Sequence, residues 1–188
     1  MNKKWLQGIL IIGYATLLTA SHAFAQQHKW AGRTLDDLEW AVHEKLAVLP
    51  GQGVFDTIRF EVQGKTVTLS GLVVNKSAKD NAELAIQQVG GIDGVVNRIE
   101  VLPQSKRDDA LRLRVYRAIY EKAPLEKYGT RSAPSIHIIV KDGWVTLEGV
   151  VDSQADRSIV ILRALNATPH VSDNLRVAAE SQKAEELR

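Results

Sequence analysis

The sequence predicts an α+β protein made of two tandem αββαβ modules, each a three-stranded mixed sheet packed against two helices. Three observations lead to this prediction: an internal repeat, alternation of apolar residues within the repeated segment, and apolar residues at helical spacing on either side of it. The composition is that of an ordinary folded chain, because 45% of the 188 residues are hydrophobic and 24% are charged.

The repeat relates residues 58–73 to residues 136–151. The two segments lie 78 residues apart without a gap, and both contain Val-Thr-Leu-x-Gly-x-Val. A shorter echo relates residues 96–101 to residues 173–177 at an offset of about 76 residues. We therefore expect two modules of about 70 residues, the second slightly shorter in its second helix or in the loop that follows.

Helical spacing precedes the first repeat. Between Thr34 and Pro50, apolar residues recur every three or four positions, which places them on one face of a helix. They are Leu35, Leu38, Val42, Leu46 and Leu49. Thr34 is the expected N-cap, and Pro50-Gly51 ends the helix.

Alternating apolar and polar residues predict two strands in each copy, the first pair within residues 58–73. Gln63-Gly64 and, in the second copy, Asp142-Gly143 fit a tight hairpin turn. Gly71 and Gly149 occupy inward positions of the second strand. We expect these two glycines to permit close backbone packing or a bulge.

An alanine-rich second helix follows at residues 78–89 and ends at Gly90-Gly91. Because this helix joins strands of one sheet, the last strand, at residues 95–101, should lie parallel to a strand of the hairpin. The chain then divides into module one (residues 35–103), a linker (104–107), module two (108–178) and a charged tail (179–188).

The first 25 residues have the features of a secretory signal peptide. Lys3 and Lys4 precede an apolar stretch at residues 8–18, and Ala23-Phe24-Ala25 fits a cleavage site before Gln26. The apolar stretch is shorter than the ~20 residues that a membrane span needs, although a retained anchor is the alternative. We therefore expect export, with residues 26–34 as a short N-terminal segment.

Charge and residue types exclude several function classes. Without residues 1–25 the chain carries 22 basic and 22 acidic side chains, so global electrostatics does not favour nucleic acid. The absence of cysteine excludes disulfides, thiolate catalysis and a lipid-modified N-terminal cysteine. No catalytic motif occurs, and the four histidines beyond residue 25 are scattered without metal-ligand spacing; they are His28, His43, His137 and His170. We expect no enzyme activity, metal or cofactor.

The pattern Val-x-Leu-x-Gly-x-Val, followed by an alanine-rich helix and a Val-x-Asn/Asp-x-Ile/Leu-x-Val strand, resembles the BON domain of bacterial envelope proteins. Two copies behind a signal peptide cover about residues 35–178. The resemblance implies a periplasmic, non-enzymatic αββαβ module that binds phospholipids or envelope surfaces. It also implies, as a hypothesis for this chain, that the first helix of module two contacts anionic lipid.

The residues of that helix are consistent with the hypothesis. On a helical wheel for residues 109–122, the inward stripe consists of Leu111, Val115, Ala118 and Ile119. The opposite side combines tyrosines and a leucine with arginines, which suits a membrane interface. The predicted lipid-binding residues are Arg112, Leu113, Arg114, Tyr116, Arg117 and Tyr120.

The sequence leaves two alternatives open. Tyr116 and Tyr120 also suit a seam between the modules, because small tandem modules usually pack together. A protein-interaction or chaperone-like scaffold for envelope proteins would instead use the outward faces of the sheets. The leading prediction is reversible association with anionic phospholipid or a membrane surface, in envelope maintenance or the stress response.

Overall fold

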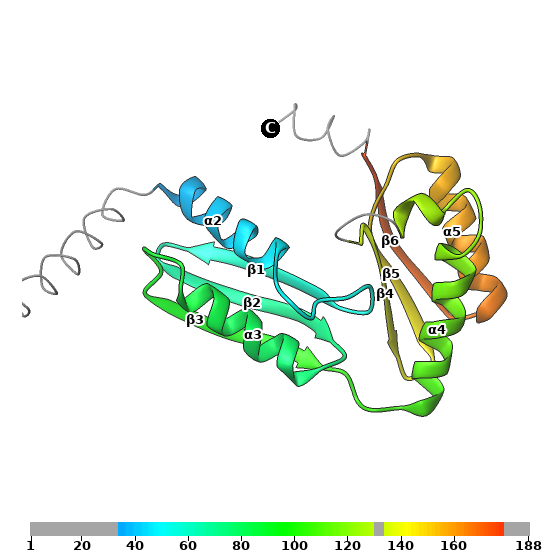
Figure 1. The fold of residues 1–188 in the computed structure, drawn as a ribbon, viewed down its shortest axis with the longest axis horizontal. Coiled ribbons are helices and arrows are strands. Elements are labelled where there is room, and N and C mark those ends of the chain that lie inside the picture. Colours follow the sequence, from blue (N-terminus) through cyan, green and yellow to red (C-terminus); the bar gives the residue numbers. More distant parts are fainter. Residues whose placement is uncertain (1–33, 130–133, 179–188) are drawn as a thin grey trace, which may run out of the picture.

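The computed structural model describes residues 34–129 and 134–178, which form two αββαβ modules (Figure 1). Module one contains α2 (Leu35–Ala47), β1 (Thr57–Gln63), β2 (Thr66–Val73), α3 (Lys76–Gln87) and β3 (Gly94–Val101). Module two contains α4 (Lys106–Tyr120), the short 3-10 helix η1 (Glu126–Tyr128), β4 (Ile136–Lys141), β5 (Trp144–Val151), α5 (Gln154–Ala167) and β6 (Val171–Val177). The predicted signal peptide and charged tail lie outside the described residues.

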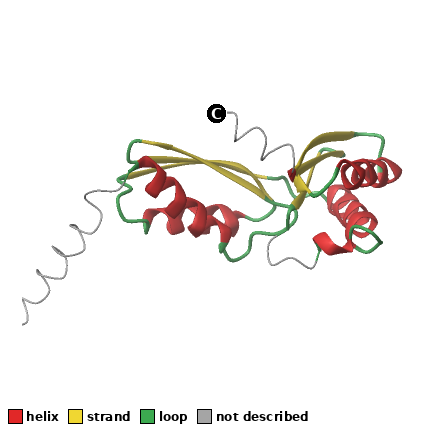
Figure 2. Ribbon diagram, turned by 90° about the horizontal axis from the view of Figure 1, so that it is seen from above, coloured by secondary structure: helices red, strands yellow, loops and turns green. Residues whose placement is uncertain are grey.

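Each module contains one mixed three-stranded sheet, as predicted. The strand orders are β1-β2-β3 and β4-β5-β6, each an antiparallel hairpin followed by a parallel strand. The registers correspond, since Ile58 pairs with Gly71 as Ile136 pairs with Gly149. Figure 2 shows that both helices of a module cover the same face of its sheet, which leaves the other face free of helices.

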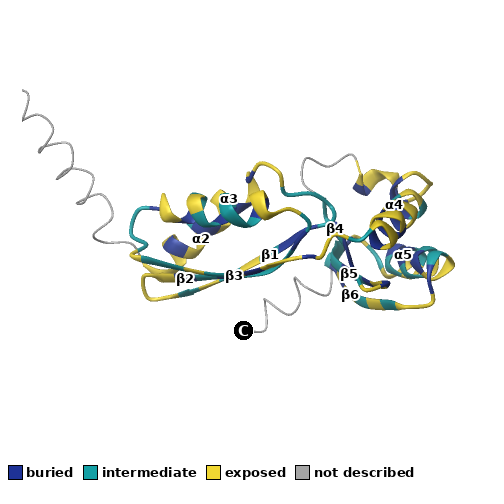
Figure 3. Ribbon diagram, turned by 90° about the horizontal axis from the view of Figure 1, so that it is seen from below, coloured by how far each residue is buried: buried dark blue, intermediate teal, exposed yellow. Residues whose placement is uncertain are grey.

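Apolar side chains form a buried cluster in each module, and Figure 3 shows buried residues on the helices and strands of both modules. Val42 of α2 and Leu69 of β2 are fully buried in module one, and Val115 of α4 and Leu147 of β5 are fully buried in module two. Burying one such side chain stabilises a fold by about 1.5–3 kcal/mol relative to leaving it exposed. Each module therefore has its own hydrophobic core.

Local details refine the boundaries expected from the sequence. Thr34 caps α2 in a capping box with Asp37. α4 begins at Lys106, because the Ser105 side chain accepts a hydrogen bond from the Asp108 N–H at 3.2 Å, so half of the expected linker is helical. The second copy is shorter in the loop after its second helix, which spans residues 168–170 compared with 88–93.

Module one contacts module two through the loop that precedes β1. The Val54 carbonyl accepts a hydrogen bond from the Ile138 N–H at 2.8 Å, on the outer edge of β4. The Phe55 ring meets the Tyr116 ring edge-on, with centroids 6.0 Å apart. Val54 and Phe55 therefore pack against the core of module two, although they belong to module one.

Polar contacts extend this seam across the helix-free face of the second sheet. Glu148 accepts hydrogen bonds from the Thr57 hydroxyl at 3.1 Å and from the Arg59 guanidinium. Lys141 forms an ion pair with Glu100 at the end of β3. The seam thus involves the sheet of module two and the strand ends of module one.

Candidate functional site

The outer surface of α4 is basic and carries one exposed leucine. Leu113 is 48% exposed, and Arg114 and Arg117 beside it are also exposed. Lys106 and Arg107 add two exposed cations in the first turn of the helix. We call these five residues the basic face of α4.

The β4–β5 hairpin fixes the start of α4. The Asp108 carboxylate is buried and accepts hydrogen bonds from the backbone N–H of Asp142 at 3.0 Å and of Gly143 at 2.9 Å. An acidic residue in the first turn also complements the helix dipole. The basic face is therefore held in a set orientation relative to the sheet.

Arg112, which the helical wheel placed among the lipid-binding residues, is buried between α4 and β4. It is 4% exposed, its Nη2 donates to the Val140 carbonyl at 2.7 Å, and its Nη1 donates to Asp109. The wheel treats the helix as if it stood alone, whereas a strand edge beside α4 presents a carbonyl that needs a donor. Arg112 therefore joins α4 to β4 and cannot contact a membrane.

The two tyrosines of the predicted site also turn inward. Tyr120 is 6% exposed, its hydroxyl donates to the Ile136 carbonyl, and burial raises its pKa. Tyr116 is half-buried, with its ring centroid 5.0 Å from that of Tyr120 and 6.0 Å from that of Phe55. Tyr120 thus belongs to the core of module two, and Tyr116 belongs to the seam that the sequence left as an alternative.

The first helix of module one has the opposite charge. Its buried residues lie 73 positions before those of α4, so the helices can be compared position by position. α2 carries four acidic residues and one lysine, a formal net of −3, whereas α4 carries five basic and two acidic residues, a net of +3. Trp40, at the position of Leu113, is 69% exposed. Both helices expose an apolar side chain, in surroundings of opposite sign.

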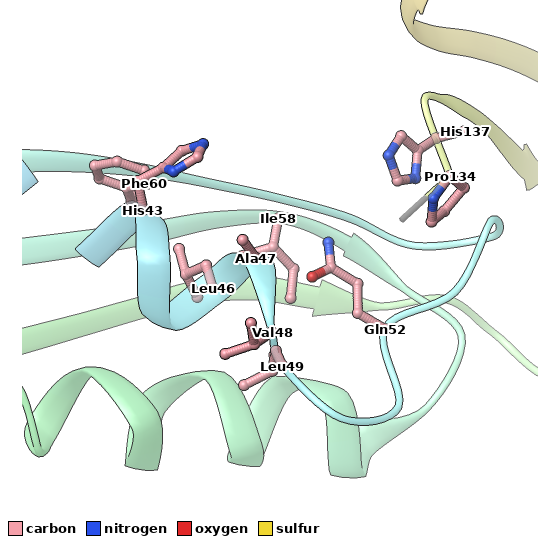
Figure 4. A pocket seen from close by; sticks show the side chains of 10 residues that line it. All are labelled: His43, Leu46, Ala47, Val48, Leu49, Gln52, Ile58, Phe60, Pro134 and His137. Atoms are coloured by element: carbon pink, nitrogen blue, oxygen red, sulfur yellow. The ribbon is translucent and has the colours of Figure 1, made fainter. Parts of the chain in front are cut away.

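A second difference between these helices creates a cavity. The positions of Tyr116 and Tyr120 hold His43 and Ala47 in module one, and a cavity of about 360 Å³ opens there between α2 and β1. Figure 4 shows its lining, which consists of His43, Leu46, Ala47, Val48, Leu49, Gln52, Ile58, Phe60, Pro134 and His137. Sequence analysis missed this cavity, although alignment of the two helices would have shown the loss of both tyrosines.

His137 lies at the end of this cavity that module two provides (Figure 4). Burial lowers its pKa, opposed by hydrogen bonds to the backbone of Asp56 and Gly53 and by the negative charges of Glu148 and Asp56. Its Nδ1 is buried and has no hydrogen-bond partner within the described part of the chain. Burial of His137 at the seam therefore favours the neutral imidazole over the protonated form.

Gly71 and Gly149 allow the first two strands of each sheet to approach closely. Their φ angles are +128° and +120°. A Cβ at either position would lie 2.1 Å from the carbonyl oxygen of Thr57 or Ser135. Only glycine fits such a site, so both residues have a structural role.

The rest of the described surface offers exposed apolar side chains. Leu162 and Leu165 of α5 are 61% and 45% exposed, so this side of α5 is not part of the seam between the modules. Within residues 34–129 and 134–178, no group of three or more His, Asp or Glu side chains is placed to hold a metal ion. In the same ranges, no helix has the length and hydropathy that a membrane span requires.

The BON domain model matches residues 34–103 and 121–179. The chain is similar to osmotically-inducible protein Y of Escherichia coli (strain K12), with 27% identity over 150 residues, 77% of this chain and 74% of that protein.

Two solved structures of CdsD, a structural protein of the type III secretion system of Chlamydia trachomatis, also match. One is 14% identical with a TM-score of 0.31, over 79% of this chain and 64% of that one. The other, of the C-terminal domain, is 12% identical with a TM-score of 0.31, over 81% and 70%. The chain thus spans less than two thirds of the first of these structures.

Proposed function

The chain belongs to the BON domain family, and we propose that it is an exported, non-catalytic binding protein of the cell envelope that associates reversibly with anionic phospholipid. The observation that carries the proposal is the exposure of Leu113 beside Arg114 and Arg117 on α4. Arginine guanidinium groups bind phosphate oxygens through charge-assisted hydrogen bonds. An exposed leucine among them can enter the boundary between headgroups and acyl chains.

The expected attachment is weak. Each basic residue near an anionic surface contributes about 1 kcal/mol, so the four cations of the basic face contribute roughly 4 kcal/mol. Partial insertion of Leu113 adds about 1 kcal/mol. A total near 5 kcal/mol corresponds to a Kd of roughly 0.1–1 mM, which makes binding reversible and sensitive to salt.

Co-sedimentation with vesicles tests the proposal. The chain without residues 1–25 should bind vesicles containing phosphatidylglycerol and should not bind pure phosphatidylcholine vesicles. Replacing Arg114 and Arg117 by glutamate should weaken binding by about tenfold or more, because it removes two attractive charges and adds two repulsive ones.

A matched control separates the basic face from net charge. The double change Lys45→Glu and Arg98→Glu alters the net charge equally but affects exposed residues of module one. This control should bind nearly as well as the unchanged chain. Equal loss in both double variants, or no loss in the α4 variant, would contradict the assignment to α4.

Export to the periplasm and a role in envelope maintenance or the stress response complete the proposal. The signal peptide expected at residues 1–25 supports export, and likeness to a protein named for osmotic induction supports the stress role. Fractionation of cells that express the full chain should recover it, cleaved before Gln26, with the periplasm. Recovery of uncleaved chain from the cytosol would contradict export.

The outward sheet faces, offered by the sequence as a protein-binding surface, receive less support. In module one that face carries charged side chains such as Arg59, Glu61 and Arg98. In module two, contacts from module one cover part of it, through Glu148 and Lys141. We therefore place the lipid-binding function first.

A further inference from the structure

The outer edge of β4 is closed by its surroundings. Three backbone groups that point away from β5 have partners from α4 or from module one. The pairs are Tyr120 Oη donating to Ile136 O, Ile138 N donating to Val54 O, and Arg112 Nη2 donating to Val140 O. A closed edge cannot pair with another strand, which protects it from aggregation.

The corresponding edge of β1 is open. The register of β1 with β2 repeats that of β4 with β5, so Ile58, Phe60 and Val62 turn the same backbone groups outward. α2 has Ala47 at the position of Tyr120 and Glu39 at the position of Arg112, so neither donor is present. Among the described residues, no backbone hydrogen bond outside the β1–β2 ladder reaches the outward groups of these three residues.

The cavity, whose lining is both polar and apolar, lies directly beside this open edge. Ile58 and Phe60 of β1 line it on one side, and Leu46 and Ala47 of α2 line it on the other (Figure 4). Unpaired backbone groups and a cavity with apolar walls from α2 and β1 thus occur together. An extended peptide needs this combination, because main-chain hydrogen bonds provide affinity and pockets for alternate side chains provide specificity.

The outer edge of β4 shows which residues pack beside the first strand of a module. On β4, the closing segment is the loop of module one, in which Val54 supplies the carbonyl. Val54 and Phe55 pack against the core of module two, and the Phe55 ring contacts Tyr116. A β-branched residue followed by an aromatic one therefore fits beside the first strand of this fold.

We propose that the β1 edge and its cavity bind an extended polypeptide segment of a partner protein, in which an aliphatic residue stands next to an aromatic one. The segment adds to the sheet as a fourth strand, next to β1, and places apolar side chains between α2 and β1. The Val54–Phe55 pair of a second copy does not supply it, because that pair is already docked on its own β4.

A peptide titration tests this proposal independently of lipid. The probe is the capped hexapeptide with the sequence of residues 52–57, Gln-Gly-Val-Phe-Asp-Thr. In NMR spectra of the folded chain, the probe should shift the amide signals of Ile58, Phe60 and Val62 in a saturable way and slow their hydrogen exchange. A probe with serine in place of valine and phenylalanine should not.

Matched tyrosine substitutions locate the site. Ala47→Tyr restores the side chain that fills the equivalent space in module two, so it should weaken probe binding by about tenfold or more while the chain stays folded. Ala110→Tyr makes the same change at an exposed position of α4 and should leave binding unchanged. Circular dichroism and thermal unfolding verify that both variants fold.

Several results would overturn the proposal. These are equal binding by the serine probe, equal binding by the Ala47→Tyr variant, shifts confined to β4, or no saturation at millimolar probe. A concentration-dependent dimer that disappears in the Ala47→Tyr variant would assign the edge to a second copy. If Ala47→Tyr does not fold, the serine probe and the hydrogen exchange of Phe60 still decide the question.

Discussion

The two modules share a fold and differ in whether side chains of the first helix form hydrogen bonds with the outer edge of the first strand. In module two, Tyr120 and Arg112 reach from α4 to the outer edge of β4 and close it. In module one, Ala47 and Glu39 stand at these positions, and the edge of β1 stays open beside a cavity. The cores are alike because both must bury a helix stripe on a sheet, whereas the helix flanks are free to differ. Function is therefore to be sought at the flanks.

The largest expected effect is a loss of stability on replacing Gly71 or Gly149, and it tests whether the two sheets are equivalent. Gly71→Ala and Gly149→Ala should each lower the free energy of unfolding of their module by more than about 4 kcal/mol, because the new Cβ would overlap a backbone oxygen. Gly94→Ala is the control, since a Cβ there meets only side-chain atoms at 3.5 Å. Urea unfolding measures all three, and tolerance of alanine at one of the first two sites would break the equivalence.

The next effect sharpens the comparison of the two helices. Tyr120→Ala should destabilise module two by about 3 kcal/mol, because it removes buried ring contacts and opens a cavity like that of module one. Tyr120→Phe should cost about 1 kcal/mol, since only the hydrogen bond to the Ile136 carbonyl is lost.

The reverse change belongs to the same comparison. Ala47→Tyr should stabilise module one by about 0.5–2 kcal/mol, because it fills a cavity at a compatible site. Thermal unfolding of the two variants should therefore shift in opposite directions. Shifts of the same sign would show that position 47 of α2 and position 120 of α4 are not equivalent.

The smallest effect concerns the seam. The pKa of His137 in the folded chain lies below its ordinary value of 6.5, chiefly because of burial. The unfolded chain then binds a proton more readily, so stability is full above pH 6.5 and declines as pH falls through the lowered pKa. Carboxylates of Asp56 and Glu148 face the imidazole and limit the decline.

Comparing stability at pH 7.5 and pH 5.5 in the unchanged chain and in His137→Gln measures this effect. The variant should lose less free energy of unfolding between pH 7.5 and pH 5.5 than the unchanged chain does. This difference should be smaller than the effects of the glycine and tyrosine substitutions. An unchanged pH dependence in the variant would exclude His137 as its source.

Part of the candidate site was predictable from the sequence. The helical wheel assigned Leu113, Arg114 and Arg117 to the outside of α4, and all three are exposed. It failed for Arg112 and Tyr120, because a wheel describes a helix on one buried surface, whereas α4 packs on a sheet and beside a strand edge. Long side chains with a polar end can turn inward to satisfy that edge, and the wheel carries no information about it.

The sequence by itself determined the fold of each module, because the repeat, its alternation and the helix spacings are local patterns that dictate which faces must be buried. The tertiary structure alone decided where the modules meet. That outcome depends on Val54 and Phe55 reaching a strand more than 80 residues later in the sequence. A contact between distant segments leaves no periodic trace, since it is specified by shape and by hydrogen-bond partners in three dimensions.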